Sequence, residues 1–186
     1  MVFAIWEIIQ LVITIVAVGI IFSTPIHRRP TDELEGEHKS NLWNEIKFGI
    51  AIAAPAVILH ELAHKFLALG YGFSATYVAS WFGLGIGIFL KFLAPGFIFF
   101  IPGYVSIIGM GTGLQFALVA IAGPLTNLAL FLIFWYMEKY SIMHKYHFVW
   151  HTGKTINLWL FIFNMLPIPG IDGFKFYLNL WQAFAG

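Results

Sequence analysis

The sequence predicts a mainly α-helical membrane protein: a multi-pass transmembrane helix bundle of about four spans plus a short C-terminal segment, with a small β-hairpin or re-entrant region. Of the 186 residues, 60% are hydrophobic and 10% are charged, whereas soluble domains usually carry about a quarter charged residues. The apolar residues also gather in stretches close to the roughly 20 residues that a helix needs to cross a bilayer. The length leaves no room for a sizeable accessory domain.

The first two apolar stretches are separated by a polar connector. Residues 3–22 predict a retained membrane helix, because the stretch lacks the basic start and the small-residue cleavage site of a secretory signal. Residues 23–46 carry mixed charges and two prolines, as a solvated loop does. A second span is predicted over 46–69. We therefore divide the chain into 1–46, an N-terminal transmembrane helix and polar connector, and 47–186, a core that carries the chemistry.

The third region, residues 70–113, is apolar but holds ten of the chain's 18 glycines. This density argues against one straight lipid-facing helix. Residues 74–81 instead alternate in the period of two that is typical of a strand. Because irregular backbone at membrane depth must be buried in protein or line water, we expect a re-entrant or interfacial β-hairpin packed on the helices. A pair of short broken spans is the alternative.

The C-terminal part of the chain contains two further apolar stretches. A third span is predicted over 114–137, and a fourth over 155–166, where two prolines end it. The last segment, 174–185, is too short for an upright span. It is expected to form a half-helix, unless the chain is truncated there.

The sequence HELAH at residues 60–64 lies inside the second span. Histidines four residues apart share one face of a helix, so His60 and His64 can reach a single ion. Zinc accepts imidazole nitrogen readily, and Glu61 between them can take a proton from a water that the metal activates. Ionisable groups in an apolar span are expensive unless they are paired, metal-bound or in contact with water. A structural polar cluster that bridges helices is the alternative.

A catalytic zinc site normally has three protein ligands and a water. The chain has no cysteine, and after Glu61 its only acidic residues are Glu138 and Asp172. An interfacial ion pair with Lys139 accounts for Glu138. Asp172 follows the proline break, where the backbone can turn and present a carboxylate; a turn residue before glycine is the alternative. The predicted ligands of one Zn²⁺ ion are therefore His60, His64 and Asp172.

Three motifs resemble those of the site-2 protease family, the M50-type intramembrane zinc metalloproteases. HELAH corresponds to the HExxH helix of the family, NMLPIPGIDG at 164–173 to its NxxPxPxxDG segment, and AGPLTN at 122–127 to its AGPxxN feature. The likeness covers about residues 47–175. It implies a zinc-dependent cut within transmembrane segments of membrane-protein substrates, with Asp172 as the third ligand.

Two asparagines of these motifs are candidate catalytic residues besides Glu61. A neutral donor stabilises the oxyanion of a tetrahedral intermediate in a low-dielectric site. Asn164 is the first candidate for this donor, because it matches the family motif. Asn127 is either a donor or an interhelical hydrogen-bonding residue. Gly123 and Pro124 are expected to allow close helix approach and a kink.

Three further histidines, His144, His147 and His151, could share a helical face and suggest a second metal site. Ordinary interfacial histidines are the favoured interpretation, because the connector is polar and rich in aromatic residues. A divalent-metal transporter or a catalytically silent membrane scaffold are the rival functions. Transport is disfavoured, because the spans offer one ligand set and no second acidic cluster.

The expected partners are the lipid bilayer and transmembrane protein substrates, and the oligomeric state is left open. The net charge of +1 gives no reason to expect a nucleic acid. The protein is expected in the cell membrane. The resemblance implies an active site towards the cytosolic side, whereas the distribution of Lys and Arg between the loops favours the exterior.

Overall fold

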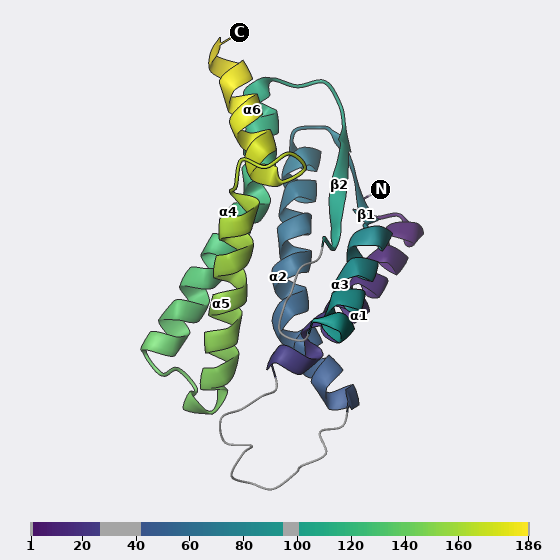
Figure 1. The fold of residues 1–186 in the computed structure, drawn as a ribbon. Helices are drawn as coiled ribbons and strands as arrows, with labels where there is room; N and C mark the ends of the chain where they lie inside the picture. Colours follow the sequence, from purple (N-terminus) through teal and green to yellow (C-terminus); the bar gives the residue numbers. More distant parts are fainter. Residues whose placement is uncertain (1, 27–41, 95–100, 186) are drawn as a thin grey trace, which may run out of the picture. The chain divides into compact units, whose positions relative to one another are not determined.

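The computed structural model describes residues 2–26, 42–94 and 101–185, and this part of the chain is mainly helical, with one small sheet (Figure 1). The predicted class, a helical membrane bundle with a β-hairpin region, is confirmed. Part of the polar connector, residues 27–41, and part of the glycine-rich region, residues 95–100, lie outside the described residues. The elements in chain order are α1 (Ile5–Ile26), α2 (Leu42–Gly70), β1 (Ser74–Ala79), α3 (Trp81–Leu93), β2 (Gly103–Ile108), α4 (Gly113–Lys139), the short 3₁₀ helix η1 (His144–Tyr146), α5 (His147–Asn164) and α6 (Asp172–Ala185).

Among the described residues, three helices are long and apolar enough to cross a membrane. They are α1, over Ile5–Ser23, together with α2 and α4, and they correspond to the first three predicted spans. The fourth predicted span, 155–166, falls mostly on α5, which ends at Asn164 and is not one of the three. Helix α5 begins earlier than expected, at His147, and its first turns carry His151 and Lys154. Its apolar part is therefore shorter than a bilayer crossing requires.

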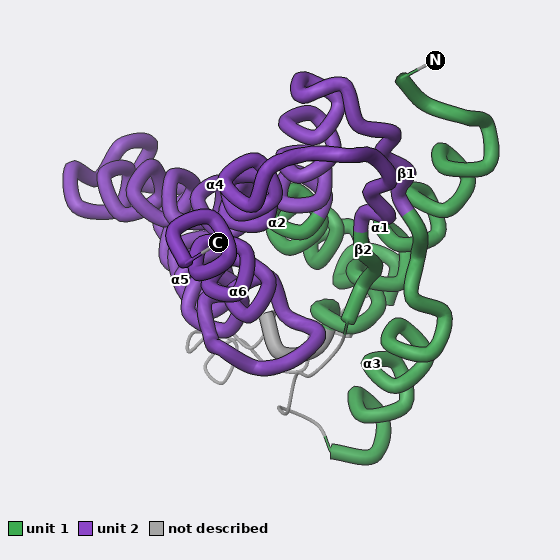
Figure 2. Tube along the Cα trace, turned by 90° about the horizontal axis from the view of Figure 1, so that it is seen from above, with its two compact units in different colours: residues 1–57, 78–104 green, residues 58–77, 105–186 purple. Residues whose placement is uncertain are grey.

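The chain divides into two compact units, each built from two separate stretches of sequence (Figure 2). Unit 1 comprises residues 1–57 and 78–104, and unit 2 comprises residues 58–77 and 105–186. Helix α2 belongs to both, and it continues through Pro55 without a break. These units are defined by contacts between residues. The predicted division into 1–46 and 47–186 instead separates the N-terminal helix and connector from the part that carries the candidate catalytic residues, and it stays a prediction.

In unit 1, α1 packs closely on the first part of α2 and also contacts α3. A Cβ atom at Gly49 would lie 2.5 Å from the Gly19 carbonyl oxygen, so the two backbones touch where glycine leaves room. Helix α1 also buries polar side chains. One of them is Gln10, whose side-chain oxygen Oε1 accepts a hydrogen bond from the Ala79 amide at 2.7 Å. Helix α1 therefore contributes to the folded core of unit 1.

The two strands pair in an antiparallel sheet, as the alternating sequence predicts. The side chains of Ala75, Tyr77 and Ala79 are buried, which is the expected one-sided burial of β1. The strands are not joined by a tight turn, because α3 lies between them in the sequence. Helix α3 begins after Ser80, whose hydroxyl accepts a hydrogen bond from the Gly83 amide and thereby caps the helix.

In unit 2, α4 packs against both α5 and α6. Glycines again mark the closest approaches: a Cβ at Gly153 of α5 would meet the Phe134 ring at 3.0 Å, and a Cβ at Gly113 of α4 would meet the Asn179 carbonyl oxygen of α6 at 2.7 Å. Thr112 and Gln115 form a capping box at the start of α4. Helix α6 spans 14 residues, in agreement with the predicted half-helix.

Candidate metal centre

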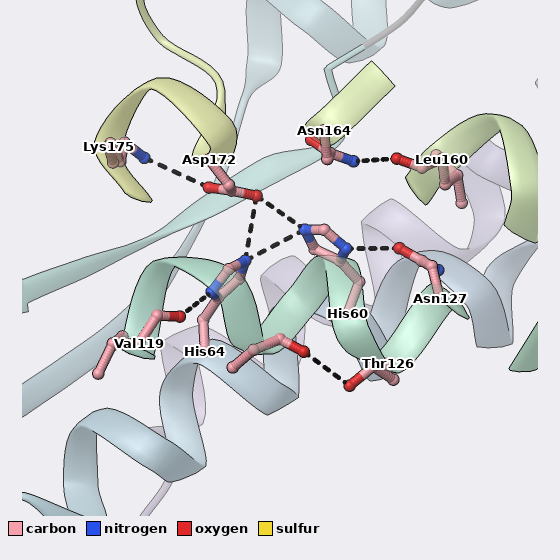
Figure 3. A network of polar contacts seen from close by, with 10 residues as sticks. His60, His64, Val119, Thr126, Asn127, Leu160, Asn164, Asp172 and Lys175 are labelled. Atoms are coloured by element: carbon pink, nitrogen blue, oxygen red, sulfur yellow. Dashed lines mark hydrogen bonds and ion pairs between the residues drawn. The ribbon is translucent and has the colours of Figure 1, made fainter. Parts of the chain in front are cut away.

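The two histidines of HELAH lie one turn apart on α2 and face the same way (Figure 3). Their Nε2 atoms are 3.1 Å apart. Both residues are buried, with 6% of His60 and 5% of His64 exposed. Since both ring nitrogens point to one place, the helix supplies half of a zinc coordination set without any rearrangement.

Asp172 is brought to the histidines by the chain break between α5 and α6. Its Oδ2 atom lies 3.0 Å from the His60 Nε2 atom and 3.1 Å from the His64 Nε2 atom (Figure 3). Gly170 turns the backbone with a φ of +95°, a value that favours glycine. Gly173 packs on the end of α5, where a Cβ would lie 2.6 Å from the Met165 backbone. The predicted turn at this break therefore presents the carboxylate to both imidazoles.

These three side chains could hold a metal ion together. One ligand atom from each lies within 4.8 Å of the others, and all three residues belong to unit 2. Among the described residues they are the one group of three or more histidine, aspartate or glutamate side chains so arranged. Lys175 lies 3.6 Å from the second carboxylate oxygen, Oδ1, and leaves Oδ2 to the histidines.

The other ring nitrogens of the two histidines face α4. The Nδ1 atom of His64 donates to the Val119 carbonyl oxygen at 2.7 Å, and the Nδ1 atom of His60 lies 2.6 Å from the Asn127 carbonyl oxygen. Gly123 lies between these two contact points. A Cβ atom there would be 2.3 Å from the His64 Nε2 atom and 2.6 Å from the His60 Nε2 atom. The sequence predicted that Gly123 allows close helix approach. In the structure it also leaves room for the Nε2 atoms of both histidines.

The hydrogen-bonding pattern tests whether these residues fit a metal. A backbone carbonyl only accepts, so the His64 Nδ1 atom carries the proton and the Nε2 atom of the neutral ring presents a lone pair. The same holds for His60 opposite the Asn127 oxygen. Two imidazole lone pairs and a carboxylate oxygen then converge with no hydrogen between them. Only a cation, either an added proton or a metal ion, satisfies this set, and nitrogen and oxygen donors suit zinc.

The protonation of Asp172 is consistent with this role. Burial opposes ionisation of its carboxyl group, but in the proton-bearing form of the cluster the hydrogen bonds and positive charge of His60 and His64 outweigh that effect and hold the pKa of Asp172 well below its usual range. The group is therefore a carboxylate, which is the form that binds metal.

Glu61 is buried beside the histidines, with 7% of the residue exposed. It follows His60 in the sequence and lies in the same turn of α2. A buried carboxyl group next to a candidate metal ligand set has the position of a general base that receives a proton from water. Its role in catalysis remains a prediction.

The two predicted asparagines have different surroundings. The Asn164 amide nitrogen donates to the Leu160 carbonyl oxygen of its own helix at 2.9 Å, so it is not directed at the ligand atoms. An oxyanion-donor role would require the side chain to turn, and it stays a prediction. Asn127 is completely buried and bridges helices: its oxygen faces His60, and its nitrogen donates to the Asn157 oxygen at 3.0 Å. Of its two expected roles, the interhelical hydrogen bond is present.

Asn157 is the residue of this network that the sequence analysis missed. Only 1% of it is exposed, and its amide nitrogen donates to the Gly153 carbonyl oxygen at 2.8 Å. No motif contains it. The available signal was a polar residue in the apolar stretch 155–166, two helical turns before Asn164, where it shares a helix face with that residue.

The apolar helices, and two buried histidines of an HExxH helix that converge with Asp172 of α6, indicate the class: a membrane protein with a candidate metal site. A comparison with curated proteins then gives the family. The chain is 34% identical over 187 residues to a protein of Methanocaldococcus jannaschii named "Putative zinc metalloprotease MJ0611", and the match covers 96% of this chain and 85% of that protein. The chain belongs to this family of zinc metalloproteases, and zinc is the metal that the family implies.

Two other comparisons return nothing. No protein-family model matches the chain, and no solved structure has significant similarity to it.

Proposed function

We propose that the protein is an intramembrane zinc metalloprotease of the site-2 protease type, which hydrolyses peptide bonds within or near transmembrane segments of other membrane proteins. One observation carries the proposal: His60, His64 and Asp172 converge beside a buried Glu61 on a helix that is apolar and long enough to cross a membrane. A soluble metalloprotease has no need to place its metal helix in such a segment.

The depth of the motif supports an intramembrane cut. His60 lies ten residues before Gly70, the last residue of α2, which corresponds to about 15 Å along a helix. Apolar sequence lies on both sides of the motif. A hydrocarbon core is about 30 Å thick, so the ligands would lie well inside it. Ionisable groups at that depth are retained where they have a function.

The proposed reaction is hydrolysis of the amide bond by water. A zinc ion held by His60, His64 and Asp172 would supply Lewis acidity for the water and for the scissile carbonyl group. Glu61 accepts one proton from the attacking water as the new carbon–oxygen bond forms. It then delivers this proton to the amine nitrogen as the carbon–nitrogen bond breaks. Asn164, turned away from Leu160, donates to the oxyanion.

The small sheet suggests how an unwound substrate would be held. Ser80, just after β1, donates to the carbonyl group before β2. The backbone N–H and C=O groups of the even-numbered residues of β1 therefore face β2, and those of the odd-numbered residues face the opposite edge of β1. There the Lys65 ammonium donates to the Ala75 carbonyl at 2.8 Å, and the Ala79 amide donates to Gln10 at 2.7 Å. Side chains thus occupy part of this edge of β1.

The outer edge of β2 is accordingly the better candidate for pairing with an extended substrate. Proline at Val105, whose amide faces that edge, removes one donor while the pairing with β1 is kept. The Val105→Pro variant should retain zinc and lose cleavage. Full cleavage by this variant would exclude pairing at this edge.

The proposed location is the cell membrane, with the site open towards the cytosolic side. The chain has no cysteine, so a single cysteine introduced at Lys175, near the site, would report orientation. In sealed inside-out vesicles an impermeant thiol reagent should label it. Labelling only in right-side-out vesicles would reverse the orientation.

The decisive experiment measures zinc content and cleavage on the purified full chain in detergent, with a panel of single-span membrane proteins as substrates. Wild type should bind zinc and cut. Glu61→Gln should bind zinc without cutting, because the ligands stay and the base is lost, whereas Asp172→Ala should lose both. Equal cleavage by wild type and Glu61→Gln would overturn the assignment of the base. Zinc binding by wild type with no cleavage of any substrate would favour the silent scaffold.

A further inference from the structure

A chain of amide groups connects His60 to the backbone of α5. The His60 Nδ1 atom contacts the Asn127 oxygen at 2.6 Å, the Asn127 nitrogen donates to the Asn157 oxygen at 3.0 Å, and the Asn157 nitrogen donates to the Gly153 carbonyl at 2.8 Å. Asn127 and Asn157 are both buried, with 0% and 1% exposed. All members belong to unit 2.

The direction of this chain is fixed at its far end. A backbone carbonyl cannot donate, so the Asn157 side chain must turn its NH₂ group towards Gly153 and its oxygen towards Asn127. Asn127 then has to present its own NH₂ group to Asn157 and its oxygen to His60. Each amide can satisfy its neighbours in only one of its two orientations. The Gly153 carbonyl of α5 therefore sets the orientation of Asn157, and the Asn157 oxygen favours the orientation of Asn127 that turns an acceptor towards the His60 ring.

We propose that Asn157 is a positioning residue of the metal centre: through Asn127 it keeps the proton of His60 on Nδ1 and leaves the Nε2 lone pair free for the metal. The proposal rests on His60 being a metal ligand, as proposed above. If Asn127 turned over, its NH₂ group would face Nδ1, the ring proton would move to Nε2, and the ligand atom would be blocked. Partners of the non-ligating nitrogen set the ring tautomer in this way in metal sites generally.

The second histidine shows why Asn157 is needed at the first. The His64 Nδ1 atom donates directly to the Val119 carbonyl, a backbone group with only one possible role. His60 instead faces a side-chain amide, whose oxygen and nitrogen can exchange places by rotation. The contact with His60 therefore leaves both orientations of Asn127 open, and the contact with Asn157 favours the one that turns its oxygen towards His60.

The test compares Asn157→Leu, which removes both amide functions at similar size, with the control Asn179→Leu. Asn179 also donates to the carbonyl four residues earlier, that of Lys175, at 2.7 Å. Zinc affinity is measured by competition with a chelator on the full chain in detergent. Asn157→Leu should weaken zinc binding by about 10- to 100-fold, whereas Asn179→Leu should stay within about two-fold of wild type. Unchanged affinity in Asn157→Leu would refute the proposal.

A second substitution separates positioning from general damage to the helix packing. Asn127→Asp offers His60 an oxygen in either orientation, so it should restore zinc binding in the Asn157→Leu background. A purely structural role of Asn157 predicts that the double variant binds zinc no better than Asn157→Leu alone, as additive damage would require. If Asn157→Leu does not fold, Asn157→Ala takes its place in the same cycle.

The tautomer itself can be read without metal. In the zinc-free protein labelled with ¹⁵N-histidine, the His60 Nδ1 atom should carry a proton in wild type and none in Asn157→Leu. An Nδ1 atom in the same state in both would contradict the proposal even if the zinc affinities differ. This measurement also separates the two proposals: wild type that binds no zinc would refute the proposed function, while the tautomer would still report on the amide chain.

Discussion

Unit 2 contains two clusters of histidine and carboxylate side chains that differ in kind. The metal cluster consists of His60, His64 and Asp172. The terminal cluster consists of Glu138 at the end of α4 with His151 and Lys154 of α5. Glu138 lies 15 residues after Gly123 on α4, which places the two clusters about 20 Å apart along that helix.

In the terminal cluster every charge meets an opposite charge. The His151 Nδ1 atom lies 2.7 Å from one oxygen of Glu138, and the Lys154 ammonium contacts the other. The His151 side chain is 57% exposed. His144 and His147 contact each other through their rings, and they do not belong to a possible metal-binding group among the described residues. A donor faces an acceptor throughout, so this cluster has no need of a metal.

The metal cluster has the opposite arrangement, because its donors are turned outward and its acceptors converge. The comparison teaches that the number of histidines in a segment does not indicate a metal site. The hydrogen-bond partners of the non-ligating nitrogens do. The sequence suggested a second metal at 144–151, and within the described residues only the metal cluster has the required arrangement.

The largest expected effect comes from Gly123→Ala, which breaks the metal cluster without touching a ligand. The added methyl group would be 2.3 Å from the His64 Nε2 atom, so α4 must move or the ring must turn. We expect zinc binding and cleavage to be lost. Gly85→Ala is the matched control, because it lies in the middle of α3 with nothing within 4 Å of the new methyl group. Normal zinc content in Gly123→Ala would contradict the close approach.

An intermediate effect is expected from Asn164→Ala. This variant tests whether Asn164 acts in cleavage without contributing to zinc binding. The Asn164 amide is satisfied by Leu160, so its removal should leave zinc affinity unchanged. If it donates to the oxyanion, the rate of cleavage should fall by about 10²- to 10³-fold. Zinc content and turnover measured on the same sample check this. An unaltered rate would remove Asn164 from the mechanism.

The smallest effect is expected when His144, His147 and His151 are all replaced by alanine. Zinc content should remain one ion per chain, since the terminal cluster holds none. Loss of the exposed His151–Glu138 contact should lower the free energy of unfolding by at most about 1 kcal/mol, which thermal unfolding in detergent would measure. A lower zinc content in this variant would revive the second metal.

Much of the fold could be predicted from hydropathy and periodicity, and the failures have local causes. The alternation in 74–81 predicts β1. Helix α3 was not predicted, because Gly83 and its neighbouring glycines suggested a break. In the structure Gly83 serves close packing: a Cβ there would lie 2.2 Å from the Ile101 carbonyl oxygen. Helix α5 extends beyond its apolar part, which hydropathy alone cannot show.

The candidate site could be predicted further than the fold. HELAH and the aspartate after the proline break are local patterns with a chemical reason for each residue. Asn157 and the role of Gly123 depend on how α4 meets α2 and α5, and no local pattern specifies a contact between helices. The sequence therefore predicts the candidate ligands, but not the residues of other helices that contact them.

The contacts of α4 with both histidines have a consequence for metal uptake. Each ring is attached to α2 by its own side chain and contacts α4 through its Nδ1 atom, His64 at Val119 and His60 at Asn127. Because it is held at both ends, neither ring rotates freely. Fixing a side chain on binding normally costs conformational entropy. Here folding has already restricted both imidazoles, so binding of an ion costs little further side-chain entropy. The site is thus preorganised by its scaffold.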